Sequence, residues 1–419
     1  MSSFLHSIWW KRCLGMTLAS LLAGCGGGGS SGSRNDPPVS TPTLSGPNVQ
    51  AVRVGSGPAG LSVRVANLLY TSVKVCEPGT SNCQVIDHVL VDTGSTGLRL
   101  LRSAVNLSLP QVQAEGKPLY NCVQFIDQSY MWGPVVSADV SMGGSQLDGQ
   151  QATQLRIQLA GATGSPAAPA DCAQEGLAAN NSINDLGANG ILGVGTDRQD
   201  CGTLCEDVTD NGYYHADHGG GVLMGIAVPR TEQIQQPVSQ FSPHNNGVII
   251  QLPTVAASGS PSATGNMIFG IGTADNNQPT STSVMAPNLW GYFTTEFDGR
   301  VLTKGFVDSG SNGWFFGTTA SPAYRLCTNA PQWYCPTSAQ TAQATNSSVN
   351  GQTSSVNVTV ANARDLFNNS AAYAYSNLAG PVGDPAAFDF GLPFFFGRSV
   401  VTALDEANTP LGQGPYVAY

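Results

Sequence analysis

Short apolar or alternating segments recur along the chain from about residue 70 onward, and Gly, Asn and Pro separate them. They include "SVKVC", "HVLVDT", "LRIQLA", "GVIIQL", "NMIFGIG", "YFTTEF" and "SSVNVTV". Segments of this length and pattern are typical of β-strands bounded by turns. A long apolar stripe with helical period is absent, and only "SPAYRLC" and "ARDLFNN" indicate short helices. The pattern predicts an all-β protein.

Two of these strands end in an aspartate. Residues 89–100 read "VLVDTGSTGLRL" and residues 305–316 read "GFVDSGSNGWFF". Charged residues make up only 11% of the chain, so a carboxylate inside an apolar segment calls for an explanation. The glycine that follows permits a sharp turn with a free backbone N–H, and the Ser and Thr hydroxyls can donate hydrogen bonds to the carboxylate.

Each acidic turn has a Gly-flanked apolar segment at a similar distance downstream. These segments are "NGILGVG", residues 189–195, and "FDFGLPFFFG", residues 388–397. The repetition predicts two similar lobes that face each other and bring Asp92 and Asp308 together. Either aspartate alone is equally well explained as a structural turn residue. A glycosidase built on a carboxylate pair has no support, because such a pair needs no duplicated Ser/Thr-Gly turn.

With these motifs the chain resembles the pepsin-like (A1-type) aspartic peptidases. "NGILGVG" resembles the segment that braces the first turn in that family, and the C-terminal "ALDEAN" and Gly-rich end resemble its closing strands. The chain also resembles a bacterial family of uncharacterised lipoproteins related to pepsins. The resemblance implies a bilobal double-β-barrel with a central active-site cleft. It makes Asp92 and Asp308 the catalytic pair. The residues that support the two turns would be Thr93, Gly94, Ser95, Ser309, Gly310 and Ser311.

Two such carboxyl groups in contact share one proton, because both cannot ionise cheaply. One then activates a water and the other polarises the scissile carbonyl, without metal or cofactor. We therefore expect an aspartic endopeptidase acting on peptides or proteins, with best activity at roughly pH 3–5 by analogy with pepsin. The alternative is a catalytically silent lipoprotein that uses the same cleft for binding. The substrate and cleavage preference do not follow from the sequence.

The flap that covers substrate in the pepsin-like family is expected in "QSYMWGPVVSADVSMGG", with Tyr130 or Trp132 as the covering residue. The alternative is that both are ordinary strand aromatics. The segment "FGLPFF" departs from the family, which usually has Gly-Asp there.

The N-terminus predicts an export signal. Lys11 and Arg12 precede an apolar run that ends in "LLAGC", which resembles a bacterial lipobox with Cys25 as the lipidated residue. An ordinary signal peptide with an incidental cysteine is the alternative. We expect residues 1–25 to be the signal and 26–48 a Gly/Ser/Pro tether. Gly26 favours the outer membrane of the bacterial envelope, with the lipid bilayer as a partner.

The folded part is expected as an N-terminal lobe at 49–245, a hinge at 246–280 and a C-terminal lobe at 281–419. Eight cysteines remain beyond the signal and anchor, an even set typical of disulfides in an exported chain. The expected pairs are Cys76–Cys83, Cys122–Cys172, Cys201–Cys205 and Cys327–Cys335. Zinc binding is the alternative, although the spacings lack the doublets of common zinc sites.

The formal net charge is −10 and the pI is about 4.8, so the chain lacks the basic footprint of a nucleic-acid binder. We expect a monomer. The segment "DNGYYHADHGGG" brings His215 and His218 near two aspartates, but its Gly-rich character favours an exposed loop, so we assign no metal ligand.

Overall fold

A computed structural model describes residues 38–317 and 322–419. The expected signal segment and Cys25 lie outside this range. The described part is built almost entirely from strands, with three short α-helices, α1 (Ile183–Leu186), α2 (Thr203–Asp207) and α3 (Ala363–Asn368). The prediction of an all-β protein is confirmed. The segment "ARDLFNN" forms α3, whereas "SPAYRLC" forms no α-helix in its described part and gives a short 3-10 turn at Pro322–Tyr324 followed by the strand residues Leu326–Cys327.

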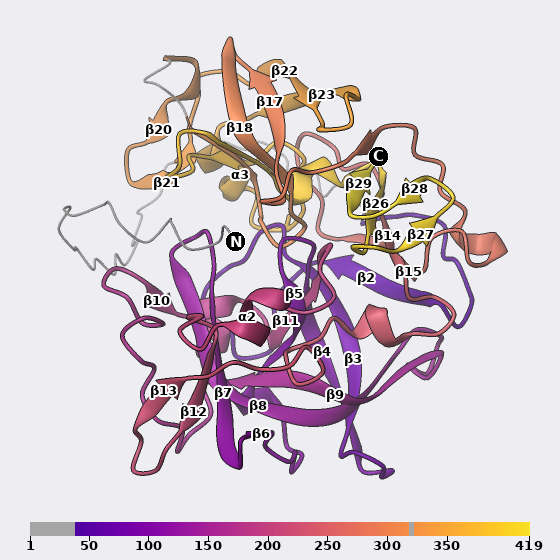
Figure 1. The fold of residues 1–419 in the computed structure, drawn as a ribbon. Coiled ribbons are helices and arrows are strands. Elements are labelled where there is room, and N and C mark those ends of the chain that lie inside the picture. The colour runs from indigo at the N-terminus through magenta and orange to yellow at the C-terminus, as the bar shows by residue number, and fades with distance from the viewer. Residues whose placement is uncertain (1–37, 318–321) are drawn as a thin grey trace. The chain divides into compact units, whose positions relative to one another are not determined.

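The first lobe lies in a large 18-stranded sheet, drawn in indigo and magenta in Figure 1. Its strands are β3 (Leu69–Cys76), β4 (Cys83–Asp92), β5 (Thr96–Leu101), β6 (Gln113–Ala114), β7 (Lys117–Gln124), β8 (Ser129–Met142), β9 (Gln150–Ala160), β10 (Ala178–Ala179), β11 (Gly190–Val194), β12 (Tyr214–Asp217) and β13 (Leu223–Gly225). Buried and exposed residues alternate along β2 (Val49–Val54) and along the outer half of β9, as expected for strands with one face on a core.

Strands from the beginning, middle and end of the described chain complete this sheet. They are β1 (Val39–Ser40), β2 (Val49–Val54), β14 (Gly247–Gln251), β15 (Ala263–Phe269), β16 (Val284–Met285), β26 (Ser399–Ala403) and β29 (Tyr416–Ala418). The β14–β15 hairpin lies between β2 on one side and β26 on the other. The segment expected as a hinge, 246–280, therefore contributes central strands that hold the two ends of the described chain together.

The second lobe is a seven-stranded sheet, with its strands in orange and yellow in Figure 1. Its strands are β17 (Phe293–Phe297), β18 (Arg300–Val307), β19 (Trp314–Phe316), β22 (Gln340–Ser347), β23 (Thr353–Val360), β24 (Ala379–Gly380) and β25 (Ala387–Phe390). Two small hairpins stand apart from it, β20 (Leu326–Cys327) with β21 (Ala330–Tyr334), and β27 (Asn408–Thr409) with β28 (Gly412–Gln413). With the first lobe, this sheet gives the expected bilobal architecture.

The core of the second lobe is aromatic. Phe388 and Phe390 on β25 stack with ring centroids 4.2 Å apart, and Phe316 stacks on Phe388 at 5.2 Å. All three rings are fully buried. Since side chains alternate along a strand, Asp389 points to the opposite face from its two neighbours.

The tether expected at 26–48 ends earlier than the sequence suggested. Val39 and Ser40 pair in parallel with β15, and the Leu44 N–H donates to the Asn266 side chain. Asn48 is buried and donates to Phe269 O. The polar composition of residues 38–48 hid this docking, which combines backbone and amide hydrogen bonds with apolar packing of Val39 and Leu44.

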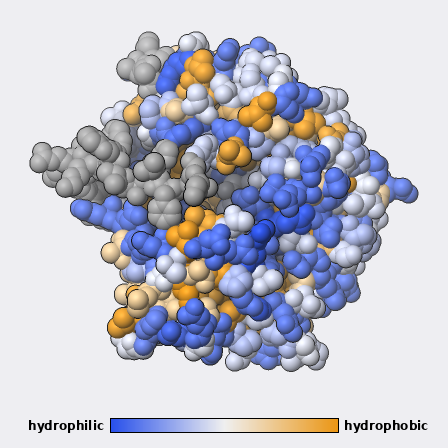
Figure 2. Space-filling model, in the orientation of Figure 1, coloured by the Kyte–Doolittle hydropathy of each residue, from blue (hydrophilic) through white to orange (hydrophobic). Residues whose placement is uncertain are grey.

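On the face drawn in Figure 2, hydrophilic and intermediate surface dominates, and hydrophobic surface forms small separate patches. Within the described ranges, no helix is long and apolar enough to cross a membrane.

All four expected cysteine pairs are disulfides in the structure: Cys76–Cys83, Cys122–Cys172, Cys201–Cys205 and Cys327–Cys335. Three of them close short loops. The Cys122–Cys172 bridge spans 50 residues and lies near the site described below.

Candidate active site

The two acidic turns meet and are linked by a reciprocal pair of hydroxyl groups. Thr93 Oγ1 accepts from the Ser309 N–H at 2.9 Å and donates to Val307 O at 3.3 Å. Ser309 Oγ accepts from the Thr93 N–H at 3.1 Å and donates to Val91 O at 2.8 Å. Each hydroxyl thus uses both its donor and its acceptor capacity on the opposite turn. These two residues hold the turns together, whereas the sequence suggested only that hydroxyls near the aspartates would donate to the carboxylates.

The carboxylate donors are the backbone amide and the serine that follow each of those hydroxyl residues. The Asp92 carboxyl accepts from the Gly94 N–H at 2.8 Å and from the Ser95 hydroxyl. The Asp308 carboxyl accepts from the Gly310 N–H at 2.7 Å and from Ser311 Oγ at 2.8 Å. The two turns therefore present their carboxyl groups with the same local hydrogen bonding.

Each glycine of the pair makes room for the carboxyl of the opposite turn. A Cβ on Gly94 would lie 2.7 Å from Asp308 Cγ, and a Cβ on Gly310 would lie 2.7 Å from Asp92 Oδ1. Both distances are well inside van der Waals contact. Gly94 and Gly310 are thus required by the close approach of the two aspartates as well as by the turns themselves.

The two carboxyl groups are in direct contact and nearly buried. Asp92 is 6% exposed and Asp308 is 8% exposed, and their side chains hydrogen-bond to each other. Burial raises the pKa of Asp92 well above its usual range, and the charge and hydrogen bond of Asp308 add to the rise. Donation from Ser95 and Gly94 opposes it. The net direction means that the pair retains a proton beyond the pH at which an isolated aspartate loses it.

Each turn is braced by the Gly-flanked strand expected from the sequence. In the first lobe β11 pairs in parallel with β4 and antiparallel with β5. In the second lobe β25 pairs in parallel with β18 and antiparallel with β19. The register places Gly193 opposite Asp92 and Phe390 opposite Val307, one residue before Asp308. The duplicated pattern in the sequence is therefore a duplicated strand arrangement in space.

The pair lies at a cleft of about 600 Å³ lined by both lobes. The first lobe contributes residues of both β4 and β5, of the β7–β8 turn and of the segment around Asp197. The second lobe contributes the loop before β17 and the second acidic turn. An open groove with two carboxyl groups is suited to an extended polypeptide, in which polar backbone groups alternate with side chains.

The hairpin β7–β8 reaches the cleft with its tip. Val123, Gln124, Phe125, Ile126 and Asp127 line the cleft, and the turn is closed by the Phe125 N–H donating to Ser129 O at 2.8 Å. The hairpin thus occupies the place of a flap, with apolar Phe125 and Ile126 at its tip.

The residues expected to cover the substrate, Tyr130 and Trp132, do not line this cleft. Trp132 is buried against Tyr120 at 5.6 Å and donates to Pro166 O, and Tyr130 pairs with β10. We therefore correct the flap assignment from Tyr130 and Trp132 to the turn that precedes them. The segment expected as the flap, residues 128–144, is mainly strand β8 (Ser129–Met142), and the turn that reaches the cleft lies before it.

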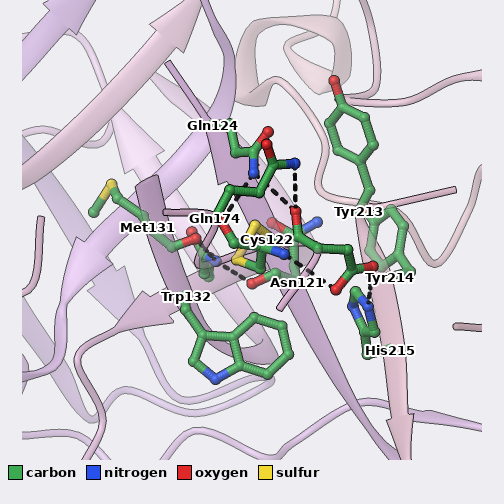
Figure 3. The surroundings of a disulfide bond; sticks show 12 residues. Asn121, Cys122, Gln124, Met131, Trp132, Gln174, Tyr213, Tyr214 and His215 are labelled. Carbon is green, nitrogen blue, oxygen red and sulfur yellow. Dashed lines mark hydrogen bonds and ion pairs between the residues drawn. A yellow bond between two sulfur atoms is a disulfide. The ribbon is translucent and has the colours of Figure 1, made fainter. Parts of the chain in front are cut away.

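The base of the flap is fixed by a disulfide, whose surroundings Figure 3 shows. Cys122 on β7 is bonded to Cys172 of the 161–177 loop. Two residues on, Gln124 Nε2 donates to both Asp171 O and Cys172 O at 2.9 Å. Gln124 also lines the cleft, and it is the residue immediately before the flap turn, so its hydrogen bonds extend the anchoring from the disulfide to the start of that turn.

A buried charged network lies beside the first turn. Arg99 is 1% exposed, and its guanidinium donates to Asn121 at 2.6 Å, Gln158 at 3.0 Å and Asp200 at 2.9 Å. Burial raises the pKa of Asp200, and Arg99 opposes that rise. Asn121 belongs to β7, so the network ties the acidic turn to the flap strand. A lone arginine in the apolar "TGLRLL" was the sequence signal for it.

His215, which the sequence placed in an exposed loop, is in fact buried in β12. Its Nε2 lies 3.0 Å from Asp171 Oδ2, and its ring packs edge-on against Trp132. The strand pairs with β7, which explains the burial. In the described ranges, no group of three or more metal-type side chains is close enough to hold an ion.

The site is a pair of contacting carboxyl groups between two acidic turns of a bilobal all-β fold, the arrangement that defines the pepsin-like fold class. Residues 45–419 match the family described as "Protein of unknown function (DUF3443)", and the chain belongs to that family.

No curated protein sequence matches the chain. Among 66 matching chains of solved structures is the crystal structure of basic 7S globulin from soybean. That likeness covers 84% of this chain and 93% of the globulin, at 12% sequence identity and a TM-score of 0.43. The strand pairings described above define the fold.

Proposed function

We propose that this protein is an aspartic endopeptidase of the bacterial cell envelope. The observation that carries the proposal is the contact between the Asp92 and Asp308 carboxyl groups at the cleft, each held by its own glycine amide and serine hydroxyl. A merely structural pair of aspartates would have no reason to face each other across an open groove, because two contacting carboxyl groups resist ionisation.

In the proposed reaction the pair carries one shared proton, because burial and the contact between the two groups disfavour ionising both, and we write this proton on Asp92. The ionised Asp308 takes a proton from a water held between the two groups, and the water oxygen attacks the scissile carbonyl carbon. Asp92 gives its proton to the carbonyl oxygen, so that a neutral tetrahedral diol forms. When the C–N bond breaks, Asp308 returns its proton to the leaving nitrogen and Asp92 regains one from the diol.

The substrate would be an extended peptide. Ile126 of the flap turn and Trp290 of the opposite loop both line the cleft, and each is about half exposed. These side chains offer apolar surface on either side of the dyad to a peptide that lies along the groove.

We further propose that Cys25 carries the lipid and that the folded part acts close to the outer membrane. The support is the lipobox-like "LLAGC" with Lys11 and Arg12 before it. The four disulfides fit an oxidising compartment outside the cytoplasm. Globomycin treatment of expressing cells, followed by metabolic labelling with palmitate, tests the anchor, and a Cys25→Ala chain that still incorporates label would overturn it.

The test of activity is incubation of the purified protein with denatured protein substrates between pH 3 and pH 8, with and without pepstatin. We expect new peptide termini by mass spectrometry in acid, and their loss with pepstatin but not with EDTA. If pepstatin binds and no cleavage occurs at any pH, the cleft binds without catalysing. Cleavage that persists under pepstatin would point to another site or a contaminant.

A further inference from the structure

A third carboxyl group lies behind the second acidic turn. Asp389 is on β25, between Phe388 and Phe390, and only 3% of it is exposed. Its strand lies between β18, which leads into Asp308, and β19, which leaves the turn. Asp389 is not among the residues that line the cleft, so substrate does not reach it.

The hydrogen bonds of Asp389 are incomplete. Its Oδ1 is buried and has no partner, and the group that hydrogen-bonds to the carboxyl is the Ser311 side chain. The ionisable groups that bear on its charge are Asp308 and Asp92, both acidic. Within the described part of the chain, no cation compensates this carboxyl. An ionised carboxylate in this position would be an unpaired buried charge beside the negative charge of the acidic pair, which is strongly unfavourable.

Ser311 connects Asp389 to the dyad. Its Oγ donates to Asp308 Oδ2 at 2.8 Å. A serine hydroxyl has one proton, so once it donates to Asp308 it can only accept from any other partner. Asp389 must then be the donor, and a carboxyl group donates only when it is protonated.

We propose that Asp389 is a positioning residue that stays protonated at the working pH and donates through Ser311 to Asp308. This inference deepens the proposed peptidase function and rests on it. The order of donation is Asp389 O–H to Ser311 Oγ, and Ser311 O–H to Asp308 Oδ2. A hydroxyl that accepts a hydrogen bond becomes a better donor. Asp389 thereby strengthens the hydrogen bond that favours the ionised form of Asp308.

The electrostatics agree with this geometry. Burial raises the pKa of Asp389 well above its usual range, and the charges of Asp308 and Asp92 raise it further. A hydrogen bond with Ser311 would lower the pKa of Asp389 only if the serine were the donor. The hydroxyl proton of Ser311 is already donated to Asp308. In the proposed working state, Asp389 is therefore neutral and the Asp92–Asp308 pair carries one proton, so the three carboxyl groups share a single negative charge.

Two measurements test the protonation without any need for turnover. Infrared spectra of the purified protein at pH 5 should contain the stretching band of a protonated carboxyl group that is missing from Asp389→Asn. The second measurement is thermal unfolding from pH 4 to pH 8. A carboxyl whose pKa is raised in the folded state contributes stability below its unfolded pKa, about 3.9, and loses it as pH rises through the folded pKa. The Tm of Asp389→Asn minus that of the wild type should therefore increase as the pH rises.

Kinetics test the positioning role. The Asp389→Leu side chain cannot donate a hydrogen bond to Ser311, so the acid limb of the kcat/KM profile should move to higher pH. We also expect kcat/KM to fall about tenfold, which corresponds to about 1.4 kcal/mol of activation free energy. Asp389→Asn, whose amide can donate to Ser311, should restore most of the lost rate and return the limb toward its wild-type position. In a Ser311→Ala background, Asp389→Leu should shift the limb no further, because its route to Asp308 is gone.

An infrared band that is unchanged in Asp389→Asn, or a Tm difference that does not grow with pH, would show that Asp389 is ionised and overturn the proposal. Equal limb shifts from Asp389→Leu with and without Ser311 would mean that Asp389 acts only as a packing residue. If the wild-type protein hydrolyses nothing, the proposed function fails, while the infrared and thermal measurements still decide the protonation of Asp389.

Discussion

The strands that brace the two acidic turns differ at equivalent positions. In the first lobe Ile191 lies opposite Leu90 on one side and Arg99 on the other. In the second lobe Asp389 lies opposite Phe306 and Phe315 in the same register. The equivalent of Ile191 is thus Asp389, and the equivalent of Arg99 is Phe315.

A buried ionisable side chain therefore lies in or beside the brace of each lobe, Arg99 on β5 in the first lobe and Asp389 on β25 in the second. Arg99 spreads its hydrogen bonds over three partners and ties the first turn to the flap strand. Asp389 has Ser311 as its partner and faces the dyad. The comparison teaches that a duplicated backbone need not duplicate electrostatics. In the first lobe the charged network reaches the flap strand, and in the second a carboxyl lies behind the acidic turn, where we propose that it acts on the Asp92–Asp308 pair.

The largest effect is expected where the two lobes are alike. Asp92→Asn and Asp308→Asn should each lower kcat by about a thousandfold or more, because neither proton transfer can be made by an amide. The loss should be similar for both, and the double variant should be little worse than either alone. Turnover assays with matched thermal melts measure this. Near-normal turnover in one variant would remove that aspartate from the mechanism.

The glycines test the close approach of the turns. Gly94→Ala and Gly310→Ala place a Cβ against the opposite carboxyl, and displacing a reacting group by about 1 Å costs about a hundredfold in rate. We expect losses of that order in kcat/KM. Gly383→Ala is the matched control, because its Cβ would meet nothing closer than 3.9 Å. If the turn variants behave like the control, the carboxyl groups are not in contact in solution.

The serines distinguish the lobes. Ser95→Ala removes one donor from Asp92, whereas Ser311→Ala removes a donor from Asp308 and also separates Asp389 from the pair. Loss of a hydrogen bond to a charged group costs about 1.5–3 kcal/mol, which corresponds to an upward shift of the acid limb by about one to two pH units. The pH profile should shift more for Ser311→Ala. Equal shifts would mean that the asymmetry between the lobes has no effect on the dyad.

The smallest effect concerns the flap, which the second lobe lacks. Replacing Cys122 and Cys172 by serine should loosen the strand that ends at Gln124 and lower kcat/KM about fivefold, or about 1 kcal/mol. The Cys76–Cys83 pair, which joins the ends of β3 and β4, is the control. An equal loss from the control would indicate general destabilisation, and no loss from Cys122 and Cys172 would show that the flap is held by Gln124 and Trp132 alone.

Much of this arrangement could be predicted from local sequence. Repetition and charged residues in apolar segments predict the two acidic turns and their bracing strands. The even set of cysteines in an exported chain predicts the disulfides. A charged residue in an apolar segment also marks Arg99 in "TGLRLL" and Asp389 in "FDFG". The roles of these two residues depend on partners on distant strands, which the local sequence does not reveal. The flap tip was misplaced because the hairpin carries several aromatic residues, and strand register rather than residue type decides which of them reach the cleft.

The most direct test of the central claim is the pH dependence of kcat/KM for the wild-type protein on a peptide substrate from pH 2 to pH 8. A dyad that works with one shared proton predicts a bell-shaped profile, because activity requires one proton to be lost and the other retained. Burial and the neighbouring charge raise the pKa of Asp92, so the alkaline limb should lie above the usual range of an aspartate. The rate should be highest in acid and decline toward neutrality. A rate that rises steadily to pH 8 would show that hydrolysis does not depend on a proton shared by Asp92 and Asp308.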